Sequence, residues 1–504
     1  MNVAEPTLLP NWLMRCAENA PERLALCCGQ LRWTFAELDR PAQCLARQLA
    51  SLDVQEGSRV ALLAANNPAY VACVHALTRL GAILVPLNTR LTQEELSWQV
   101  NDVHASLLIS DSHYAEVAAN IKLPDLPSAI LAMERDNAVL RGIDETEVPL
   151  RNLIDLSATQ AIMYTSGTTG LPKGVLITYG MQWWNAVGSA LNLGHHPDDC
   201  WLACLPLFHI GGLSILFRSV IYGISVVLLE KFEPVAVNRA IHEERVTIIS
   251  VVAVMLQRML SALDSEQAGT RYPGALRCVL LGGGPAPRPL LEDCANRAIP
   301  VVQTYGLTEA CSQAVTLSPA DALRKLGSAG RPLMPVQLRI MDDALPVPAN
   351  APGIIYLKGP TITPGYADRP EATAQALRDG WLSTGDIGYL DEEGYLYVLD
   401  RRSDLIISGG ENVYPAEIES MLLAHPDVEE AGVCGQSDPQ WGQVPIAFVR
   451  LHPGSSVDAE TLLNHTAQRL ARYKLPRAVY FVNQLPRNSA GKLIRRELGR
   501  LLEK

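Results

Sequence analysis

The chain reads Arg59-Val-Ala-Leu-Leu-Ala64, then a helical pattern from Ala69 to Leu80, and then Ala82-Ile-Leu-Val-Pro-Leu87. A buried strand, a helix and a second buried strand in this order form a βαβ unit, which places both strands parallel in one sheet. Further continuous apolar runs occur at Ser225–Glu230, Val246–Val252 and Leu276–Gly284. Such runs are typical of strands whose two faces are covered by helices. The sequence therefore predicts a large, layered α/β domain with parallel-type sheets.

Two other units follow in the chain. From about Gly327, short segments such as Gly353-Ile-Ile-Tyr-Leu-Lys358 are separated by Pro and Gly, which predicts a small β module. The remaining hundred residues contain helical and strand patterns of their own and can form a separate α+β core. We therefore expect a large domain, residues 1–402, and a smaller α+β C-terminal domain, residues 403–504. The polar, irregular stretch between Ser128 and Asn152 predicts a variable surface connection.

The overall composition narrows the class of protein. The chain has 504 residues, 48% of them hydrophobic, and a net charge of -11, so it offers no basic surface for nucleic acid. Its eleven cysteines show no paired C-x-x-C spacing, which favours reduced thiols and the cytoplasm. The N-terminus lacks the pattern of a signal or transit peptide. The most apolar window, Leu213–Leu229, contains Arg218 and predicts a buried helix followed by a strand, without stable membrane insertion.

A loop rich in Gly, Ser and Thr lies at Tyr164-Thr-Ser-Gly-Thr-Thr-Gly-Leu-Pro-Lys-Gly-Val175. Glycines allow the backbone to approach phosphate oxygens, hydroxyls donate to them, and a lysine adds charge. The candidate phosphate contacts are Thr165, Ser166, Gly167, Thr168, Thr169 and Lys173. Pro172 and Gly174 stand where the common NTPase loop has glycine and a magnesium-binding hydroxyl, so phosphate hydrolysis is disfavoured. A flexible surface loop is the alternative, but twelve consecutive residues of this kind favour ATP binding.

Four further motifs occur in order: Thr304-Tyr-Gly-Leu-Thr-Glu-Ala310, Ser383–Asp391, Asp400–Asn412 and Pro486–Leu493. Together with the loop, they resemble the adenylate-forming acyl-CoA synthetases over nearly the whole chain. The resemblance implies that a small carboxylic acid reacts with ATP to give an acyl-adenylate and pyrophosphate, and that the acyl group then passes to the thiol of coenzyme A. It also implies Mg²⁺ as the cofactor. Such a site must supply cations that stabilise charge in the transition state.

The resemblance assigns a role to individual residues. Lys492 would bridge the carboxylate and the α-phosphate, Glu309 would bind Mg²⁺ through a hard oxygen, and Tyr305 would lie against adenine. Asp386 and Arg401 would hold the ribose hydroxyls. The implied catalytic residues are Lys492, His209, Thr308 and Glu309, with Glu309 and Thr169 at the metal. The remaining implied contacts to ATP or coenzyme A are Gly283, Gly284, Gly306, Gly409 and Gly410.

Members of this family use one site for two reactions by rotating the small domain. Ser403 occupies the hinge position, where tolerance of backbone change matters more than the side chain. After the rotation, the Ser408-Gly-Gly-Glu411 segment would face the site, and its two glycines would leave a passage for the pantetheine arm. A simple hairpin turn is the alternative interpretation of Gly409 and Gly410.

Segments around the expected acyl pocket indicate which carboxylic acid is the substrate. His209 would lie at the pocket mouth, although a single His in an apolar run is more often a core residue. Thr178–Gly194 and Leu216–Gly223 resemble the branch of the family that activates 2-succinylbenzoate in menaquinone biosynthesis. This acid has a second carboxylate that the pocket must satisfy. The candidate pocket residues are His209, Ser214, Gly283, Thr304, Ser312 and Gln313.

Other functions stay open from the residues alone. A different aryl or medium-chain acyl-CoA ligase would share the same catalytic motifs. An adenylation module that loads a carrier protein is a second alternative, which the acceptance of free coenzyme A would exclude. The simultaneous presence of Lys492, Glu309 and Asp386 opposes a catalytically silent binding protein. Whether identical chains assemble into an oligomer is also left open.

Overall fold

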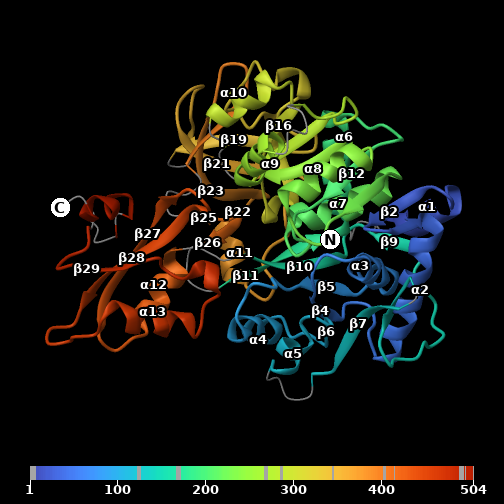
Figure 1. Ribbon diagram of the computed structural model, residues 1–504, viewed down its shortest axis with the longest axis horizontal. Coiled ribbons are helices and arrows are strands. Elements are labelled where there is room, and N and C mark those ends of the chain that lie inside the picture. Colours follow the sequence, from blue (N-terminus) through green and yellow to red (C-terminus); the bar gives the residue numbers. More distant parts are fainter. Residues whose placement is uncertain are drawn as a thin grey trace.

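The computed structural model describes residues 7–121, 126–134, 136–165, 172–265, 271–283, 286, 288–342, 345–400, 405–413, 415–486, 493 and 495–502. The described strands form five sheets, which are joined and covered by helices (Figure 1). Two large sheets belong to the N-terminal part of the chain. A small antiparallel ladder also occurs there, between β1 (Leu8–Pro10) and β9 (Leu153–Asp155).

The first large sheet has the strand order β11-β10-β5-β4-β6-β7-β8. The strands are β4 (Arg59–Leu63), β5 (Ile83–Pro86), β6 (Leu107–Asp111), β7 (Ser128–Glu134), β8 (Asn137–Leu140), β10 (Thr159–Thr165) and β11 (Lys173–Thr178). The five strands from β10 to β7 are parallel, and β11 and β8 close the edges antiparallel. The accompanying helices are α2 (Phe35–Ser51), α3 (Pro68–Leu80), α4 (Gln93–Asp102) and α5 (Ala115–Ala119). The predicted βαβ unit is confirmed as β4, α3 and β5.

The second large sheet has the order β18-β17-β16-β15-β14-β12-β13-β2-β3, and its strands from β16 to β2 are parallel. The strands are β2 (Leu24–Cys28), β3 (Leu31–Thr34), β12 (Cys200–Ala203), β13 (Ser225–Leu228), β14 (Ile248–Val252), β15 (Cys278–Gly282), β16 (Val301–Leu307), β17 (Ser312–Thr316) and β18 (Arg331–Pro332). The helices are α1 (Trp12–Asn19), α6 (Tyr179–Leu193), α7 (Ile210–Tyr222), α8 (Pro234–Glu243), α9 (Ala253–Ser265) and α10 (Arg288–Asn296), with short 3-10 turns η1 (Thr308–Ala310) and η2 (Pro319–Asp321).

The predicted β module is an antiparallel six-stranded sheet. It contains β19 (Gln337–Asp342), β20 (Leu345–Pro346), β21 (Gly353–Lys358), β22 (Leu377–Arg378), β23 (Trp381–Leu390) and β24 (Leu396–Asp400), and α11 (Pro370–Ala376) lies beside it.

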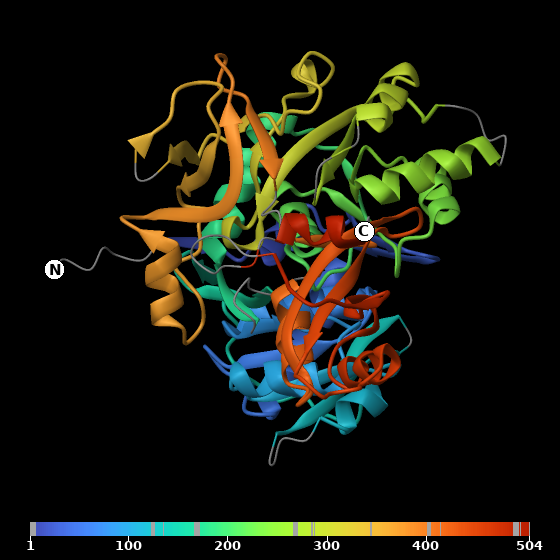
Figure 2. The same ribbon diagram turned by 90° about the vertical axis from the view of Figure 1, so that its left-hand side faces the viewer.

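The C-terminal unit has its own five-stranded sheet and its own apolar core. Its elements are β25 (Ile406–Ser408), β26 (Glu411–Val413), α12 (Pro415–Leu423), β27 (Val428–Asp438), β28 (Gly442–Leu451), α13 (Ala459–Ala467), η3 (Arg472–Lys474), β29 (Val479–Phe481), η4 (Arg495–Glu497) and η5 (Gly499–Leu502). Figures 1 and 2 show this orange-to-red unit against one side of the remaining chain. The predicted boundary between residues 402 and 403 lies outside the described residues and stays a prediction.

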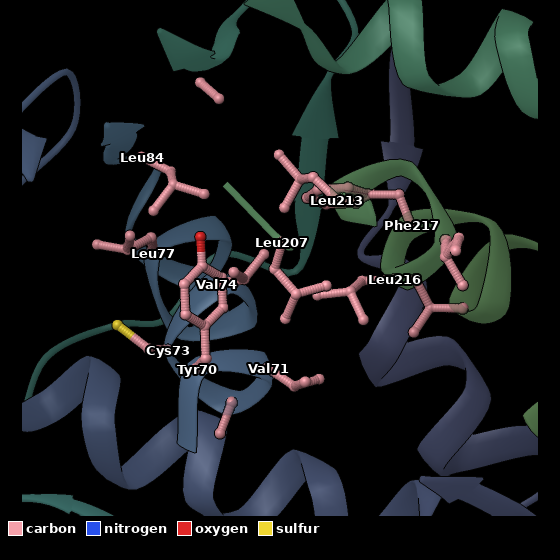
Figure 3. Packing of buried hydrophobic residues seen from close by; sticks show 14 of the residues in the cluster. Tyr70, Val71, Cys73, Val74, Leu77, Leu84, Leu207, Leu213, Leu216 and Phe217 are labelled. Atoms are coloured by element: carbon pink, nitrogen blue, oxygen red, sulfur yellow. The ribbon is translucent and has the colours of Figure 1, made fainter. Parts of the chain in front are cut away.

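The main core lies between the two large sheets and contains α3, whose residues are all buried. This helix begins where the Asn67 side chain accepts from the Tyr70 amide, and it ends at Gly81, which has a left-handed φ of 70°. Figure 3 shows α3 packed against α7 and the segment that precedes it. The contributing side chains of α3 are Tyr70, Val71, Val74 and Leu77, and those on the other side are Leu207, Leu213, Leu216 and Phe217. Each such buried aliphatic side chain stabilises the fold by about 1.5–3 kcal/mol.

The structure corrects one prediction and confirms another. The region from Ser128 to Asn152 is not an irregular connection throughout, because β7 and β8 extend the first sheet there. Ala129 and Leu131 are buried in β7, and the polar residues around this short run masked its strand character. The window from Leu213 to Leu229 is α7 followed by β13, as predicted. Within the described part of the chain, every helix is too short or too polar to span a bilayer.

Candidate active site

A cavity of about 970 Å³ opens at the carboxyl ends of the parallel strands. Asn66 follows β4, Leu205 follows β12, Gly283 follows β15, and Thr304 belongs to β16, and all four residues line it. The carboxyl edge is where ligands bind in sheets of this kind, because successive strand-to-helix loops converge there. Residues of the C-terminal unit complete the cavity wall. The candidate site is therefore shared between the two parts of the chain.

Most of the described candidates from the sequence meet in this cavity. Those that line it are Thr165, Lys173, His209, Gly283, Thr304, Gly306, Thr308, Glu309, Ser312, Gln313, Asp386, Gly409 and Gly410. Two described candidates, Ser214 and Tyr305, are not among its lining residues. The remaining candidates lie outside the described residues, and their assignments stay predictions: Ser166, Gly167, Thr168, Thr169, Gly284, Arg401, Ser403 and Lys492.

Two paired strands, β10 and β11, border the end of the cavity where we expect the anionic phosphates. Thr165 ends β10 and Lys173 begins β11, and the two residues are cross-strand partners. The ammonium of Lys173 lies over the ring of Tyr366, 5.3 Å from its centroid. The hydroxyl of Tyr366 donates a 3.1 Å hydrogen bond to Oε1 of Glu309. A cation and a carboxylate therefore face the same space, as binding of a polyphosphate together with a divalent cation requires.

Glu309 suits Mg²⁺ because a carboxylate is a hard oxygen ligand. Within the described ranges, no cluster of three or more His, Cys, Asp or Glu side chains could hold a metal by itself. Mg²⁺ commonly binds through one or two protein carboxylates while phosphate oxygens and water fill its other positions. A single carboxylate in the same cavity as Lys173, the candidate phosphate contact, fits that arrangement.

Asp386 occupies another part of the wall. It is buried, and its Oδ2 accepts a 2.6 Å hydrogen bond from the hydroxyl of Tyr305. The ring of Tyr305 itself packs in the core of the β module. Tyr305 therefore fixes the Asp386 carboxylate, whereas its contact with adenine stays a prediction. Because an ionised carboxylate only accepts hydrogen bonds, Asp386 is suited to a pair of ribose hydroxyls.

Only glycine fits at position 306, because the neighbouring strand approaches its backbone closely. A Cβ at this position would lie 1.5 Å from the carbonyl oxygen of Ser312 on the neighbouring strand. Any side chain would therefore force β16 and β17 apart and would move Thr304, Ser312 and Gln313 away from the cavity.

Arg218 is a functional candidate that the sequence reasoning missed. It belongs to α7, is 2% exposed and lines the cavity. Its Nη2 donates a 2.5 Å hydrogen bond to Oδ1 of Asn185, and its guanidinium lies over the ring of Trp201. Burial lowers the pKa of Arg218 from its ordinary value, but an arginine still carries its charge in proteins. The signal was present in the sequence, since Arg218 is the charged residue within the most apolar window.

Gln313 lies on β17 and is 1% exposed at the cavity wall. Within the described part of the chain, its side-chain nitrogen and oxygen have no hydrogen-bond partner, and neither has Nε of Arg218. An unpaired buried polar group costs about 1–3 kcal/mol, so these atoms need a polar partner. An anionic ligand group would accept hydrogen bonds from the two nitrogens, whereas the amide oxygen needs a donor. The hydroxyl of Ser214 donates to the carbonyl oxygen of Ile210 in the preceding turn, and its contact with the acid stays a prediction.

The C-terminal unit contributes a hairpin to the wall. β25 and β26 pair antiparallel, with Ser408 opposite Glu411, so the alternative interpretation of Gly409 and Gly410 as a hairpin turn is confirmed. The same turn lines the cavity, and its role as a passage for the pantetheine arm stays a prediction. The φ values of Gly409 and Gly410 are 57° and 86°, in the left-handed region that favours glycine. A Cβ at position 409 would lie 2.6 Å from Cε3 of Trp441.

Contacts of Glu411 hold the hairpin against the larger part of the chain. Its Oε1 lies 3.0 Å from Arg90, and its Oε2 lies 3.1 Å from Nε2 of His209. Asn88 donates to the same carboxylate. Burial would raise the pKa of Glu411, but the nearby charges of His209 and Arg90 together with the hydrogen bonds outweigh it, so that the pKa is lowered.

A second contact between the two parts involves a buried lysine. Nζ of Lys474 lies 2.6 Å from Oε1 of Glu95 on α4 and 2.8 Å from Oε1 of Glu417 on α12. Lys474 is 3% exposed, so breaking this contact would leave charges without a partner. The orientation of the C-terminal unit is therefore specified by two separate clusters of charges.

Comparisons with known proteins agree with this arrangement. Residues 13–367 match the AMP-binding enzyme family, and residues 417–492 match the AMP-binding enzyme C-terminal domain. A 2-succinylbenzoate–CoA ligase of Geobacillus kaustophilus is 55% identical over 498 residues, which cover 99% of both chains.

Two structures of the o-succinylbenzoate CoA synthetase of Bacillus subtilis are also similar. A double mutant bound to a product analogue gives a TM-score of 0.91 at 45% identity, covering 98% of this chain and 99% of the other. The complex with the acyl-adenylate intermediate gives a TM-score of 0.73 at 44% identity, covering 98% of both chains. Since the sequence identity and coverage of the two structures are nearly equal, we attribute the difference in TM-score to a different arrangement of the parts of the chain. The arrangement seen here resembles that of the complex with the product analogue.

Proposed function

This chain is a member of the AMP-binding enzyme family, and we propose that it joins 2-succinylbenzoate to coenzyme A through an acyl-adenylate. The reaction is a step of menaquinone biosynthesis and uses ATP and Mg²⁺. In the first half-reaction, a carboxylate oxygen of the acid attacks the α-phosphorus of ATP and pyrophosphate leaves. In the second, the coenzyme A thiol attacks the acyl carbon, loses its proton, and AMP leaves.

The first half-reaction brings a carboxylate to a polyphosphate of the same sign of charge. We assign the attraction of the phosphates to Thr165 and Lys173 and the acceptance of hydrogen bonds from the ribose to Asp386, and the position of all three residues at the cavity wall supports this. We assign the Mg²⁺ contact of the protein to Glu309. When bound, Mg²⁺ would neutralise charge on the phosphate oxygens. The bridging role of Lys492 remains part of this proposal.

The choice of acid rests on Arg218. A buried guanidinium at the cavity wall, with Nε still unpaired among the described residues, is suited to a second carboxylate. The unpaired amide of Gln313 adds a donor and an acceptor to the same wall. Benzoate or a medium-chain fatty acid would leave Nε of Arg218 and Nε2 of Gln313 without an acceptor. The second carboxylate of the dicarboxylate can accept from both nitrogens, in agreement with the relatives named above.

The second half-reaction uses the hairpin of Gly409 and Gly410. The two glycines leave room in the wall beside Trp441, and we infer that the pantetheine arm passes there. The chain is arranged as in the Bacillus subtilis complex with the product analogue, and this similarity supports the assignment. All eleven cysteines are free, as is typical of cytoplasmic proteins, and we place the reaction in the cytoplasm. Assembly of identical chains stays a prediction that sedimentation velocity tests.

The test is pyrophosphate release by the purified protein with Mg-ATP and coenzyme A. Rates are compared for 2-succinylbenzoate, benzoate and a medium-chain fatty acid. We expect a preference for the dicarboxylate of roughly hundredfold or more in kcat/KM, on the order of 3 kcal/mol in transition-state binding. Preference for a simpler acid would contradict the proposed substrate, and failure of free coenzyme A to accept the acyl group would indicate a carrier protein instead.

A further inference from the structure

Residues 363–367 join the two elements that form the anion-binding end of the cavity. The amide of Thr363 donates to the carbonyl oxygen of Glu309 at 2.8 Å. The amide of Leu176 on β11 donates to Gly365 at 3.1 Å, and the amide of Ala367 donates to Gly174 at 2.7 Å. The segment is thus fixed by its backbone both to the strand that begins at Lys173 and to the turn that contains Glu309.

Tyr366 lies at the centre of this segment and lines the cavity. Its hydroxyl donates to Oε1 of Glu309 at 3.1 Å, and its ring lies 5.3 Å from the ammonium of Lys173. We propose that Tyr366 is a positioning residue that holds Glu309 for the divalent cation and Lys173 for the phosphates. This inference rests on the proposed function, because it concerns the binding of Mg-ATP at the same site.

A tyrosine suits this role because it contacts both charges and neutralises neither. A cation in its place would form an ion pair with Glu309 and reduce its attraction for a divalent cation, and a carboxylate would do the same to Lys173. The phenol hydroxyl restricts rotation of the Glu309 carboxylate through a charge-assisted hydrogen bond. The negative face of the ring attracts the ammonium of Lys173 without an opposite charge. Tyr366 therefore orients both side chains without cancelling the charge of either.

Two substitutions separate the two contacts. Tyr366→Phe removes the hydroxyl and keeps the ring, so it should weaken binding of ATP about tenfold in the presence of Mg²⁺ and leave binding of metal-free ATP unchanged. Tyr366→Leu also removes the ring, so it should weaken binding of metal-free ATP by roughly threefold. Isothermal titration calorimetry measures these affinities without catalysis, with Mg²⁺ and with EDTA.

Tyr389→Phe is the matched control. Tyr389 lies in β23 of the same β module, its ring stacks on Tyr397, and it is not among the residues that line the cavity. This variant should bind ATP as the unchanged protein does under both conditions. Loss of affinity in Tyr366→Phe to the same extent with and without Mg²⁺ would indicate a structural effect and would overturn the inference. An unchanged affinity for Mg-ATP would overturn it as well.

Glu309→Gln tests whether Tyr366 acts through Glu309. The single variant should lose affinity for Mg-ATP, and adding Tyr366→Phe should cause no further loss, because the two residues share one interaction. Additive losses would overturn the inference. Preference of the unchanged protein for 2-succinylbenzoate is measured separately, so a failure of the proposed substrate would be distinguished from a failure of the role of Tyr366.

Discussion

Nε2 of His209 lies 3.1 Å from Oε2 of Glu411, and the two residues are separated by 202 positions in the chain. His209 precedes α7 in the large α/β part, whereas Glu411 begins β26 in the C-terminal unit. The carboxylate is 3% exposed, so it is removed from water by this arrangement of the two parts. If the C-terminal unit rotates, both residues must lose the contact. The pair therefore favours the arrangement in which Gly409 and Gly410 line the cavity.

Glu411→Gln should slow transfer of the acyl group to coenzyme A and spare adenylate formation. The amide retains the shape of the side chain but loses the charge that His209 and Arg90 share. We expect thioester formation from preformed acyl-adenylate to fall about tenfold, as for a lost charge-assisted contact. Rapid-quench measurement of each half-reaction checks this. An equal decrease in pyrophosphate release would show that Glu411 acts on the site as a whole.

The same contact predicts a dependence on pH. The pKa of Glu411 is lowered from 4.5 in this arrangement, because the charges of His209 and Arg90 outweigh the effect of burial. A lowered pKa stabilises the arrangement fully above about 4.5, and the stabilisation is lost as the pH falls through the lowered value. Tyr473 and Asn88, the other facing groups, stay neutral in this range. The rate of thioester formation should therefore fall below pH 4.5, and the Glu411→Gln variant should lack this decrease.

The site residues that lie within short local motifs could be predicted from the sequence. Lys173, Glu309 and Asp386 each lie within a short recognisable run, and the structure brings them to one cavity. Contacts between distant segments could not be predicted in this way. The position of Arg218 at the cavity wall follows only when α7 lies beside β17, and that of Tyr366 only when its segment pairs with β11.

The side chains of Tyr305 and Ser214 show a related limit. A motif places a residue along the chain but does not decide which side of a strand or helix its side chain contacts. Tyr305 packs in the core of the β module and donates to Asp386, and the hydroxyl of Ser214 bonds within its own helix, so their contacts with adenine and the acid stay predictions. The strand β7 was missed because its apolar run is short, and its pairing with β6 adds the hydrogen bonds that fix it.

Gly409→Val should block the second half-reaction. Position 409 has a φ of 57°, which a β-branched residue adopts only with strain, and its Cβ would lie 2.6 Å from Trp441. The hairpin or Trp441 must then move into the space that we assign to the pantetheine arm. We expect a large increase in KM for coenzyme A, with adenylate formation nearly unchanged. Unaltered coenzyme A kinetics would exclude this passage. Gly454→Val is the control for strain alone, because Gly454 also has a positive φ, a Cβ there would meet no other atom within 4 Å, and it is not among the residues that line the cavity.

Lys492→Ala should have the opposite effect. The side chain that we assign to the carboxylate and the α-phosphate would be missing, so pyrophosphate release from acid and ATP should fall by two or more orders of magnitude, roughly as for other lost transition-state contacts. Thioester formation from supplied acyl-adenylate should continue. Survival of both half-reactions to the same extent would refute the assignment of Lys492.

Arg218→Met should change the choice of acid rather than the chemistry. The guanidinium is 2% exposed and its charge is the one that we assign to the second carboxylate, while methionine fills a similar volume without charge. We expect kcat/KM for 2-succinylbenzoate to fall roughly hundredfold, because a charge-assisted contact is lost in a dry pocket. The low activity toward benzoate should persist or rise, since benzoate has no second carboxylate to satisfy.

Arg218→Lys completes this experiment by keeping the charge without the planar fork. Because Nη2 of Arg218 also donates to Asn185, a general loss of stability must be separated from a loss of specificity. Thermal unfolding of each variant provides that separation. A parallel decrease for both acids at unchanged thermal stability would show that Arg218 supports the pocket without contacting the second carboxylate. A decrease confined to the dicarboxylate, partly restored in Arg218→Lys, would establish that contact, because only the dicarboxylate distinguishes a charged from an uncharged side chain at this position.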